Sequence, residues 1–364
     1  MDLKIENLSL EEKIGQMLIV GIEGDKITER TRKLILKYKI GGVILYRKNF
    51  DTYDKMIQLI KDLKELNKQN KVPLFISIDQ EGGRVNRMPK EFLNLPAANL
   101  IATKMGEEGI KKAANIISEI LSKAGFNMNF APVLDLKRFN TKAIGDRCFD
   151  SDYKKVSKYG LMQINEYKSN NIIAVAKHFP GHGATKVDSH FMLSKINLDI
   201  KTLENEDMVP FEEAIKNGVD GILVGHLKIH RLADKKPCSL SRKFITKYLR
   251  RKYNYKGLVI SDDLKMKAIK YRYGTVNALA KAFEAGNDIS IIRFDEIREE
   301  KAILKVTELA RKNILNNYRI NASVKRILKV KAKYHINDIT DYKIDVNIEK
   351  INKEIEKIRK IVYT

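Results

Sequence analysis

Residues 257–263 read Gly-Leu-Val-Ile-Ser-Asp-Asp, a short apolar run that ends in two aspartates. Seven further apolar runs of strand length occur along the chain, at residues 16–22, 41–46, 73–79, 127–135, 172–178, 221–226 and 288–292. Runs rich in Val, Ile and Leu without strict alternation are typical of parallel strands buried on both faces. Because a stretch of helical periodicity follows each run, the pattern indicates βαβ units. Eight such units predict a closed (β/α)8 barrel of the TIM type.

Boundary residues support this division of the chain. Ser9 followed by Glu12 predicts a capping box that opens the first helix, and Ser241 predicts the start of a helix over 242–252. The span from residue 16 to residue 293 is close to the roughly 250 residues typical of such a barrel. A single α/β domain is therefore favoured over two domains.

After residue 295 the sequence pattern predicts helices and no further strands. Helices over 297–318 and 321–334 are expected to close the barrel. The tail carries apolar residues at alternating spacings of three and four, namely Ile348, Ile351, Ile355, Ile358 and Val362. We expect this stripe to be the buried face of a C-terminal helix, with self-association through it as the alternative. The expected organisation is a catalytic barrel over residues 1–335 and a helical tail over 336–364 that packs on it.

The composition is that of a folded protein with a large positive charge. Hydrophobic residues make up 43% of the 364 residues, which is enough for a sizeable core. The chain holds 69 Lys and Arg against 46 Asp and Glu, a formal net charge of +23. The lysines are spread over nearly every predicted surface helix and form no basic block with interleaved aromatics. We therefore expect no nucleic-acid partner.

The cysteine content and the hydropathy pattern indicate the cellular compartment in which we expect the protein. Cys148 and Cys238 are the only cysteines, so no disulfide framework is implied and a reducing compartment is favoured. Residues 1–16 contain no apolar segment of the signal-peptide kind, and no run of about 18 apolar residues could span a bilayer. We expect a cytoplasmic protein that is soluble and has no membrane partner.

The polar residues that end the apolar runs are the candidates for chemistry, because active sites of such barrels lie at the carboxyl ends of the strands. These ends carry Asp79, Asp135, Lys177, His178, His226, Asp262, Asp263 and Arg293. By the period of two along a strand, Asp262 and Asp263 are expected to point to opposite sides. One of the two would face the pocket, where a carboxylate can act as a nucleophile, and the other would cap the next helix. Periodicity does not say which.

Residues 79–87 read Asp-Gln-Glu-Gly-Gly-Arg-Val-Asn-Arg. The two glycines permit a sharp turn that folds Arg84 or Arg87 back over the mouth of the barrel. Asp79 could then form a structural ion pair with one of these arginines. It could equally accept hydrogen bonds from two hydroxyls of a sugar, and these residues alone favour neither interpretation.

Residues 177–190 form the densest polar segment, Lys-His-Phe-Pro-Gly-His-Gly-Ala-Thr-Lys-Val-Asp-Ser-His. His178 and His182 are four residues apart, as zinc ligands on a helix can be. A proline and two glycines between residues 180 and 183 break any helix there. The two imidazoles therefore cannot share a helical face, and a polar loop over the barrel mouth is favoured over a metal site.

The same segment and one further loop contain more candidate residues. Asp188 and His190 are two residues apart, so the carboxylate could hold one tautomer of the imidazole and make it a general acid/base. The alternative is a solvated pair in a loop. Arg147, taken by itself, is expected to form an ion pair with Asp146 or Asp150 of its own loop.

Together these motifs resemble family 3 glycoside hydrolases, specifically the single-domain β-N-acetylglucosaminidases of the NagZ type. The most specific match is Lys-His-Phe-Pro-Gly-His-Gly at 177–183 followed by Asp-Ser-His at 188–190. Four further motifs extend it over most of the chain: Glu-Glu-Lys-Ile-Gly-Gln-Met at 11–17, Gly-Gly-Val-Ile-Leu at 41–45, Asn-Phe-Ala-Pro-Val-Leu-Asp at 129–135 and Ser-Asp-Asp-Leu at 261–264.

The resemblance implies a retaining exo-enzyme that removes non-reducing terminal N-acetylglucosamine from peptidoglycan fragments through a covalent glycosyl-aspartate. Asp262 matches the nucleophile, and His190 with Asp188 matches a histidine-aspartate acid/base dyad. The positions that match those holding the sugar are Asp79, Arg87, Arg147, Lys177 and His178. No metal or organic cofactor is implied, and we expect a monomer whose partners are small carbohydrate substrates.

Three rival functions remain open on the sequence. The first is a phosphorylase, because a neutral histidine does not repel an incoming phosphate as a glutamate would. The second is a β-glucosidase or a broad exo-hexosaminidase on the same barrel. The third is a non-enzymatic binder of anionic polymers, which the net charge of +23 would suit.

Overall fold

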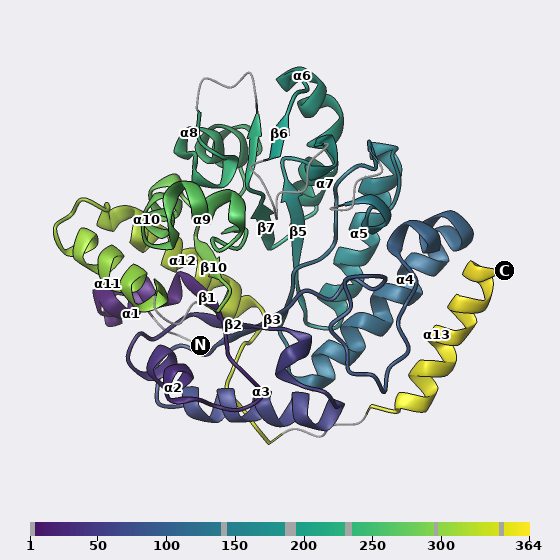
Figure 1. The fold of residues 1–364 in the computed structure, drawn as a ribbon, viewed down its shortest axis with the longest axis horizontal. Helices are drawn as coiled ribbons and strands as arrows, with labels where there is room; N and C mark the ends of the chain where they lie inside the picture. Colours follow the sequence, from purple (N-terminus) through teal and green to yellow (C-terminus); the bar gives the residue numbers. More distant parts are fainter. Residues whose placement is uncertain (1–3, 140–143, 186–193, 230–234, 295–297, 342–345) are drawn as a thin grey trace.

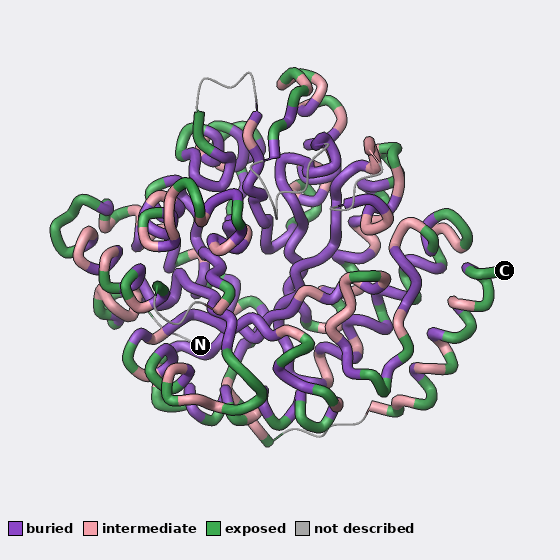
Figure 2. The backbone as a smooth tube through the Cα atoms, in the orientation of Figure 1, coloured by how far each residue is buried: buried purple, intermediate pink, exposed green. Residues whose placement is uncertain are grey.

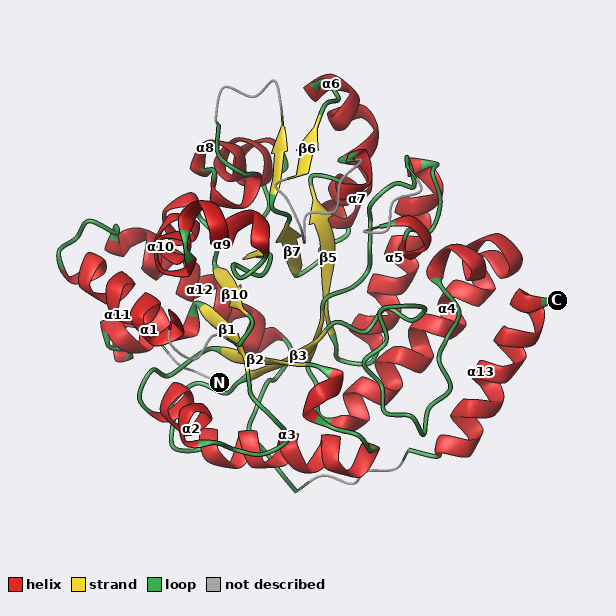
Figure 3. Ribbon diagram, viewed as in Figure 1, coloured by secondary structure: helices red, strands yellow, loops and turns green. Residues whose placement is uncertain are grey.

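The structure is a computed structural model that describes residues 4–139, 144–185, 194–229, 235–294, 298–341 and 346–364. A closed barrel of parallel strands forms its centre, in the order β1-β10-β9-β7-β5-β4-β3-β2 (Figures 1 and 3). Its strands are β1 Leu18–Gly21, β2 Gly42–Leu45, β3 Phe75–Ile78, β4 Met128–Asn129, β5 Ile173–Phe179, β7 Gly221–Val224, β9 Leu258–Ser261 and β10 Ile289–Ile292. Each lies within a predicted apolar run or ends one residue beyond it. The predicted (β/α)8 barrel is confirmed.

Helices surround the barrel. The α-helices are α1 Leu10–Gln16, α2 Glu29–Leu36, α3 Tyr53–Asn67, α4 Ala98–Ala124, α5 Tyr153–Ser169, α6 Ile200–Thr202, α7 Val209–Lys216, α8 Arg242–Ile245, α9 Lys267–Tyr273, α10 Thr275–Ala285, α11 Arg298–Arg311, α12 Asn317–Lys333 and α13 Ile348–Tyr363. Shorter or differently wound turns are η1 Ile5–Asn7, η2 Arg47–Asn49, η3 Gly145–Arg147, η4 His182–Ala184, η5 Leu203–Asp207, η6 Cys238–Leu240 and η7 Thr246–Lys252.

Local hydrogen bonds explain several of these boundaries. The predicted capping box is present, because Ser9 Oγ accepts from the backbone N–H of Glu12 while the Glu12 carboxylate accepts from that of Ser9. Ser241 Oγ likewise accepts from the N–H of Phe244 and starts α8. The helix predicted over 242–252 is α-helical only in α8, and η7 continues it with π-type winding.

The predicted boundary between the two helices after residue 295 is wrong. We expected 297–318 and 321–334, whereas α11 ends at Arg311 and α12 begins at Asn317. Asn313 adopts a left-handed backbone with a φ of 54°, which stops the first helix. The side chain of Asn316 accepts from the N–H of Tyr318 and caps the second helix. The asparagines thus set a boundary that the apolar periodicity does not show.

A small parallel sheet of β6 Ser194–Ile196 and β8 Leu227–Ile229 lies beyond the carboxyl ends of β5 and β7 (Figure 1). Ser194 pairs with Leu227 and Ile196 with Ile229. The sequence analysis missed this sheet, because three residues are too few to show a strand period. Its first strand, β6, begins at Ser194, where the described chain resumes after Thr185.

The C-terminal helix α13 lies beside α4 on the outside of the barrel (Figures 1 and 2). Four residues of the expected stripe are buried: Ile351, Ile355, Ile358 and Val362. The Asn352 side chain adds polar contacts, because it accepts from the N–H of Leu93 and donates to the carbonyl of Glu91. Among the described residues, no helix combines the length and the apolar character needed to cross a membrane.

A buried lysine closes the amino end of the barrel. Lys331 of α12 is fully buried, and its Nζ donates to Gln16 Oε1 at 2.8 Å, to the carbonyl of Gly41 at 2.9 Å and to that of Pro73 at 2.6 Å. These acceptors precede β1, β2 and β3 respectively, and Nζ also lies 4.4 Å from the centre of the Phe75 ring. Burial lowers the pKa of Lys331 to about 7. The three acceptors and the ring face offset the cost of removing this group from water.

Replacing Lys331 by methionine is expected to lower the free energy of unfolding by about 2–4 kcal/mol, because the acceptors at the amino ends of three strands lose their donor. Urea denaturation of Lys331→Met measures the loss. The matched control is Lys329→Met, which changes an exposed lysine of the same helix and should cost less than about 0.5 kcal/mol. Equal stability of the two variants would show that Lys331 does not hold the strand ends together.

Candidate active site

A cavity of about 130 Å³ lies at the carboxyl ends of the barrel strands. Six of the residues predicted from the sequence line it, namely Asp79, Arg87, Arg147, Lys177, His178 and Asp262. They come from the segments after β3, β4 and β9 and from the end of β5. Closure of the barrel therefore brings together side chains that are up to 183 residues apart in sequence.

An irregularity in β5 lets two consecutive residues of the strand face this cavity. In a regular strand the side chains of Lys177 and His178 would point to opposite faces. The register of β5 against β7 shifts between Ala176 and Phe179, as it does at a β-bulge. Both Lys177 and His178 consequently line the cavity.

A buried carboxylate, Glu81, connects the cationic residues of the site. Its Oε1 lies 2.5 Å from Lys177 Nζ and 2.7 Å from Arg147 Nη2, and its Oε2 accepts from Arg147 Nε at 2.8 Å. Lys177 Nζ also donates to Asp79 Oδ1 at 2.9 Å. Burial opposes ionisation of Glu81, but the charges of Arg147 and Lys177 hold its pKa well below the usual value. The sequence analysis did not select Glu81, although it lies two residues after Asp79 in the same motif.

The ion pairs that were expected within single loops do not form. Asp146 pairs with Arg84 at 2.7 Å, and Asp150 pairs with Lys155 at 3.1 Å, so neither is the partner of Arg147. Both carboxylates are near the surface, whereas the side chain of Arg147 is 11% exposed. Of the two interpretations left open for Asp79, the ion pair with a neighbouring arginine does not form among the described residues, where the cation that Asp79 contacts is Lys177.

Arg87 lines the cavity and has a buried side-chain donor without an acceptor among the described residues. Its backbone N–H donates to Gln80 Oε1, which fixes the turn, and its guanidinium lies 5.9 Å from the centre of the Tyr46 ring. Within the described residues, the buried Nε of Arg87 has no hydrogen-bond acceptor. A buried donor without an acceptor is costly in the absence of a ligand.

Asp135, at the end of the fourth apolar run, orients the histidine of the site. Asp135 is fully buried and its Oδ2 lies 2.7 Å from His178 Nδ1, while the backbone N–H of His182 donates to its Oδ1 at 2.6 Å. Burial opposes ionisation of Asp135, but the His178 ring lowers its pKa. A carboxylate on Nδ1 fixes the ring orientation and the tautomer, and directs Nε2 away from the carboxylate.

The ring of His182 packs against the ring of His178. The two rings meet edge to face with their centres 5.7 Å apart. Burial, and then the neighbouring His178, lower the pKa of His182 to about 4. Among the residues that the structure describes, no group of three or more His, Cys, Asp and Glu side chains is arranged to hold a metal ion.

Asp262 and Asp263 both line the cavity, so the prediction that only one of them faces it is wrong. The reason is that β9 ends at Ser261, and the alternation of a strand does not extend to the two aspartates. The N–H of Asp263 donates to Asp262 Oδ1 at 2.8 Å. Asp263 Oδ1 in turn accepts from the N–H groups of Lys265 and Arg293. Burial raises the pKa of Asp263 to about 6 despite these donors.

The predicted acid/base pair, Asp188 and His190, lies outside the described residues. The described chain stops at Thr185 on one side and resumes at Ser194 in β6 on the other. Thr185 is buried, and its hydroxyl lies 3.0 Å from His182 Nδ1. Thr185 is thus tied to His182 of η4, which follows β5.

Comparison with known families agrees with this arrangement. Residues 9–330 match the model of the glycosyl hydrolase family 3 N-terminal domain. The chain belongs to glycosyl hydrolase family 3. The predicted family and the predicted class of enzyme, a glycoside hydrolase, are confirmed.

Family 3 relatives match over most of this chain. A beta-hexosaminidase A of Pseudoalteromonas piscicida is 33% identical over 326 residues, which cover 83% of this chain and 54% of that protein. A beta-hexosaminidase of Neisseria meningitidis is 30% identical over 295 residues, 78% of this chain and 81% of the relative. This chain thus spans about half of the first relative and about four fifths of the second.

A solved family 3 structure has the same fold. The β-N-acetylglucosaminidase of Paenibacillus sp. str. FPU-7 superposes with a TM-score of 0.92 at 30% identity. The alignment covers 98% of this chain and 69% of the Paenibacillus chain. The similarity therefore includes the helices after the barrel as well as the barrel itself.

Glu81→Gln is expected to lower the free energy of unfolding by about 3–5 kcal/mol, because it leaves Arg147 and Lys177 buried without the carboxylate they share. Urea denaturation measures this loss. Asp146→Asn, which removes the carboxylate of the exposed pair with Arg84, serves as the control and should cost less than about 1 kcal/mol. A loss in Glu81→Gln no larger than in this control would contradict a structural role for Glu81.

Asp263→Asn is expected to change the pH dependence of stability. Because the folded-state pKa of Asp263 is raised to about 6, its contribution to stability is present below about pH 4 and is lost as the pH rises through 6. Relative to wild type, the asparagine variant should therefore gain about 2–3 kcal/mol between pH 4 and pH 7. Urea denaturation at both pH values, with the exposed Asp54→Asn as control, tests this. A constant difference between the variant and wild type would contradict it.

Proposed function

We propose that this family 3 chain is a retaining exo-β-N-acetylglucosaminidase in which Asp262 is the nucleophile. The observation that carries the proposal is the meeting of Asp262 with Asp79, Arg87, Arg147, Lys177 and His178 around one cavity. A carboxylate beside donors for sugar hydroxyls is what a glycosidase site requires. The names of the relatives, beta-hexosaminidase and β-N-acetylglucosaminidase, support the choice of sugar.

In the first step a carboxylate oxygen of Asp262 attacks the anomeric carbon as the bond from that carbon to the leaving oxygen breaks. The N–H of Asp263 on Oδ1 holds the Asp262 carboxylate in one orientation for this attack. We assign His190 as the group that gives its proton to the leaving oxygen, with Asp188 as its hydrogen-bond partner. The product is a covalent glycosyl-aspartate and a free aglycone.

In the second step His190 removes a proton from water, and the resulting hydroxide attacks the anomeric carbon. The bond to Asp262 then breaks and returns the carboxylate, so the sugar is released with its original configuration. We assign Asp79, Lys177, Arg147, Arg87 and His178 to holding the sugar through both steps. The ion cluster around Glu81 fixes Arg147 and Lys177 in place before substrate arrives, which reduces the cost of ordering them.

The substrates that we propose are peptidoglycan fragments in which N-acetylglucosamine is linked to muramic acid, and the compartment is the cytoplasm. The positive charge of the chain suits the anionic muramic acid and its peptide. Both cysteines, Cys148 and Cys238, are buried and not bonded to each other, as is usual in a reducing compartment.

Release of nitrophenol from the p-nitrophenyl β-glycosides of N-acetylglucosamine and of glucose tests the function. Wild type should prefer the N-acetylglucosaminide, and added phosphate should not alter the products. Asp262→Asn should lower kcat/KM at least 1,000-fold, because the nucleophile is removed. The exposed Asp54→Asn serves as the matched control and should retain wild-type activity.

Three outcomes of this assay would contradict the proposal. Accumulation of a sugar 1-phosphate would make the chain a phosphorylase, and equal turnover of the glucoside would make it a broad glycosidase. Unchanged activity of Asp262→Asn would show that another group is the nucleophile. Competition between a muropeptide and chitobiose then decides the aglycone, and a lower kcat/KM for the muropeptide would contradict the proposed substrate.

A further inference from the structure

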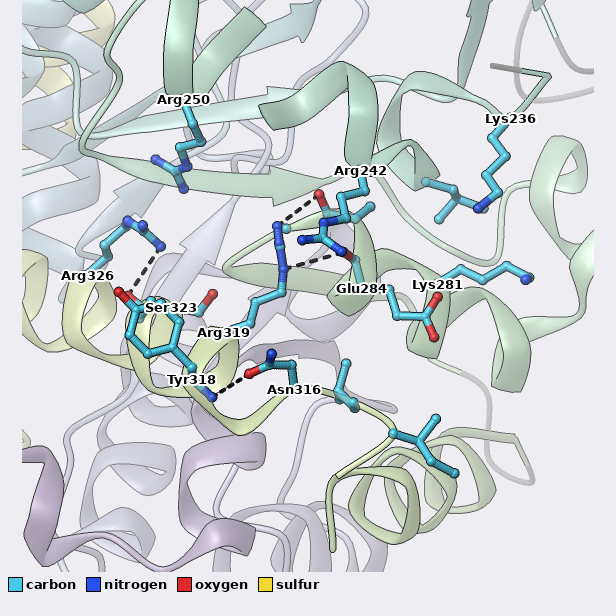
Figure 4. Close-up of a pocket in the computed structure, with 16 residues that line it drawn as sticks. Lys236, Arg242, Arg250, Lys281, Glu284, Asn316, Tyr318, Arg319, Ser323 and Arg326 are labelled. Carbon is cyan, nitrogen blue, oxygen red and sulfur yellow. Dashed lines mark hydrogen bonds between the residues drawn. The ribbon is translucent and has the colours of Figure 1, made fainter. Parts of the chain in front are cut away.

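A second and larger cavity, of about 500 Å³, is lined by side chains of helices that surround the barrel, and Figure 4 shows these side chains. Residues of α8, η7, α10 and α12 line it, together with the connection between α11 and α12. It shares no lining residue with the cavity that contains Asp262. Its size is within the range of small-molecule sites.

Cationic side chains dominate the lining of this cavity, which we call the basic pocket. Six of them contribute, namely Lys236, Arg242, Arg250, Lys281, Arg319 and Arg326, whereas Glu284 is the one carboxylate among the lining residues that the structure describes. A neighbouring hollow continues the charge and is lined by Lys236, Arg242, Lys243, Thr246, Lys247 and Arg251. This concentration of charge contrasts with the even spread of lysine expected from the sequence.

A buried aspartate holds two arginines of the basic pocket in place. Asp288 is fully buried, and it accepts from Arg250 Nη2 at 2.5 Å and from Arg326 Nη1 at 2.9 Å. Its Oδ2 also accepts from the N–H of Val259 in β9. The two guanidinium groups are therefore held in fixed positions, although one carboxylate balances only one of their charges.

The remaining arginines face the pocket without a matching carboxylate. In the described part of the chain, Arg242, Lys281 and Arg319 form no ion pair. Arg319 Nε and Nη2 reach the carbonyls of Glu284 and Ala285 only at 3.4 and 3.5 Å. Burial, and then the charge of Arg242, lower the pKa of Arg319. Two guanidinium groups that repel each other across an open cavity are stabilised when an anion binds between them.

The lack of a side chain at Gly286 leaves room for the guanidinium group of Arg319. Gly286, at the end of α10, has a φ of 105°, and a Cβ there would lie 2.4 Å from Arg319 Nη2. Any larger residue would displace the guanidinium from the pocket. At the rim, Tyr318 and Ile314 are 82% and 62% exposed, so an apolar surface is available beside the charged one.

We propose that the basic pocket binds a small oligophosphate, a compound with two or more linked phosphate groups. Planar guanidinium groups match phosphate oxygens in pairs, which favours phosphate over a less charged carboxylate ligand. Several positive charges around one cavity require an anion that carries more than one negative charge. The exposed Tyr318 can contact an organic part of such a ligand, as a nucleoside would provide.

Isothermal titration calorimetry of the full chain with inorganic tripolyphosphate tests the proposal. We expect one site, with binding at least tenfold weaker in Arg319→Gln and in Arg242→Gln than in wild type. Arg242 is exposed and forms no described ion pair, so its replacement should not impair folding. Arg32→Gln, which removes an exposed arginine of α2, is the matched control and should leave the affinity within about twofold of wild type. Asp262→Asn should bind as wild type does, because the active-site cavity is separate.

Equal weakening in Arg32→Gln and Arg242→Gln would overturn the proposal, because it would show general attraction to a chain of charge +23. Unchanged affinity in Arg319→Gln and Arg242→Gln, or no binding of tripolyphosphate to wild type, would do the same. If a single-stranded oligonucleotide binds and tripolyphosphate does not, the proposal is overturned and the ligand is a polymer. A nucleoside triphosphate that binds more tightly than tripolyphosphate would support the proposal. Loss of this additional affinity in Tyr318→Ala would show that Tyr318 contacts the nucleoside.

Discussion

The buried carboxylate of Glu81 is the contact on which the candidate active site depends. It lies between Arg147 of η3 and Lys177 of β5, and Lys177 extends the cluster to Asp79. Without a shared counter-charge, two buried cations at this end of the barrel would repel each other and lose their hydration. With it, Arg147 and Lys177 are held beside the cavity before any ligand binds, and the site needs little reorganisation.

The two ends of the barrel use buried charge for different purposes. At the amino end, Lys331 donates to acceptors before three strands and fills the space beneath them. This group has no route to a substrate, so its role is structural. At the carboxyl end, the charged groups line a cavity, and the Nε of Arg87 has no acceptor among the described residues. The difference agrees with the general division of such barrels into a stabilising face and a catalytic face.

The positively charged residues of the chain differ in how far nearby carboxylates balance their charge. Several lysines on exposed helix faces form pairs such as Lys112 with Glu108, which contribute little to stability. The basic pocket between α8, α10 and α12 is different, because buried Asp288 holds two of its arginines and its cationic side chains outnumber the carboxylates that line it. A charge excess of this kind raises the free energy of the unoccupied protein, which is the physical reason to expect an anionic ligand.

By itself, the sequence determined the barrel, since eight apolar runs without alternation fit only strands buried on both faces. It also identified Asp79, Lys177, His178 and Asp262, because each ends such a run. The tertiary structure alone decided which charges meet. Glu81 pairs with Arg147 across 66 residues, and Asp146 pairs with Arg84 instead of its neighbour. Periodicity describes a side chain relative to its own strand, whereas ion pairs depend on which loops the closed barrel brings together.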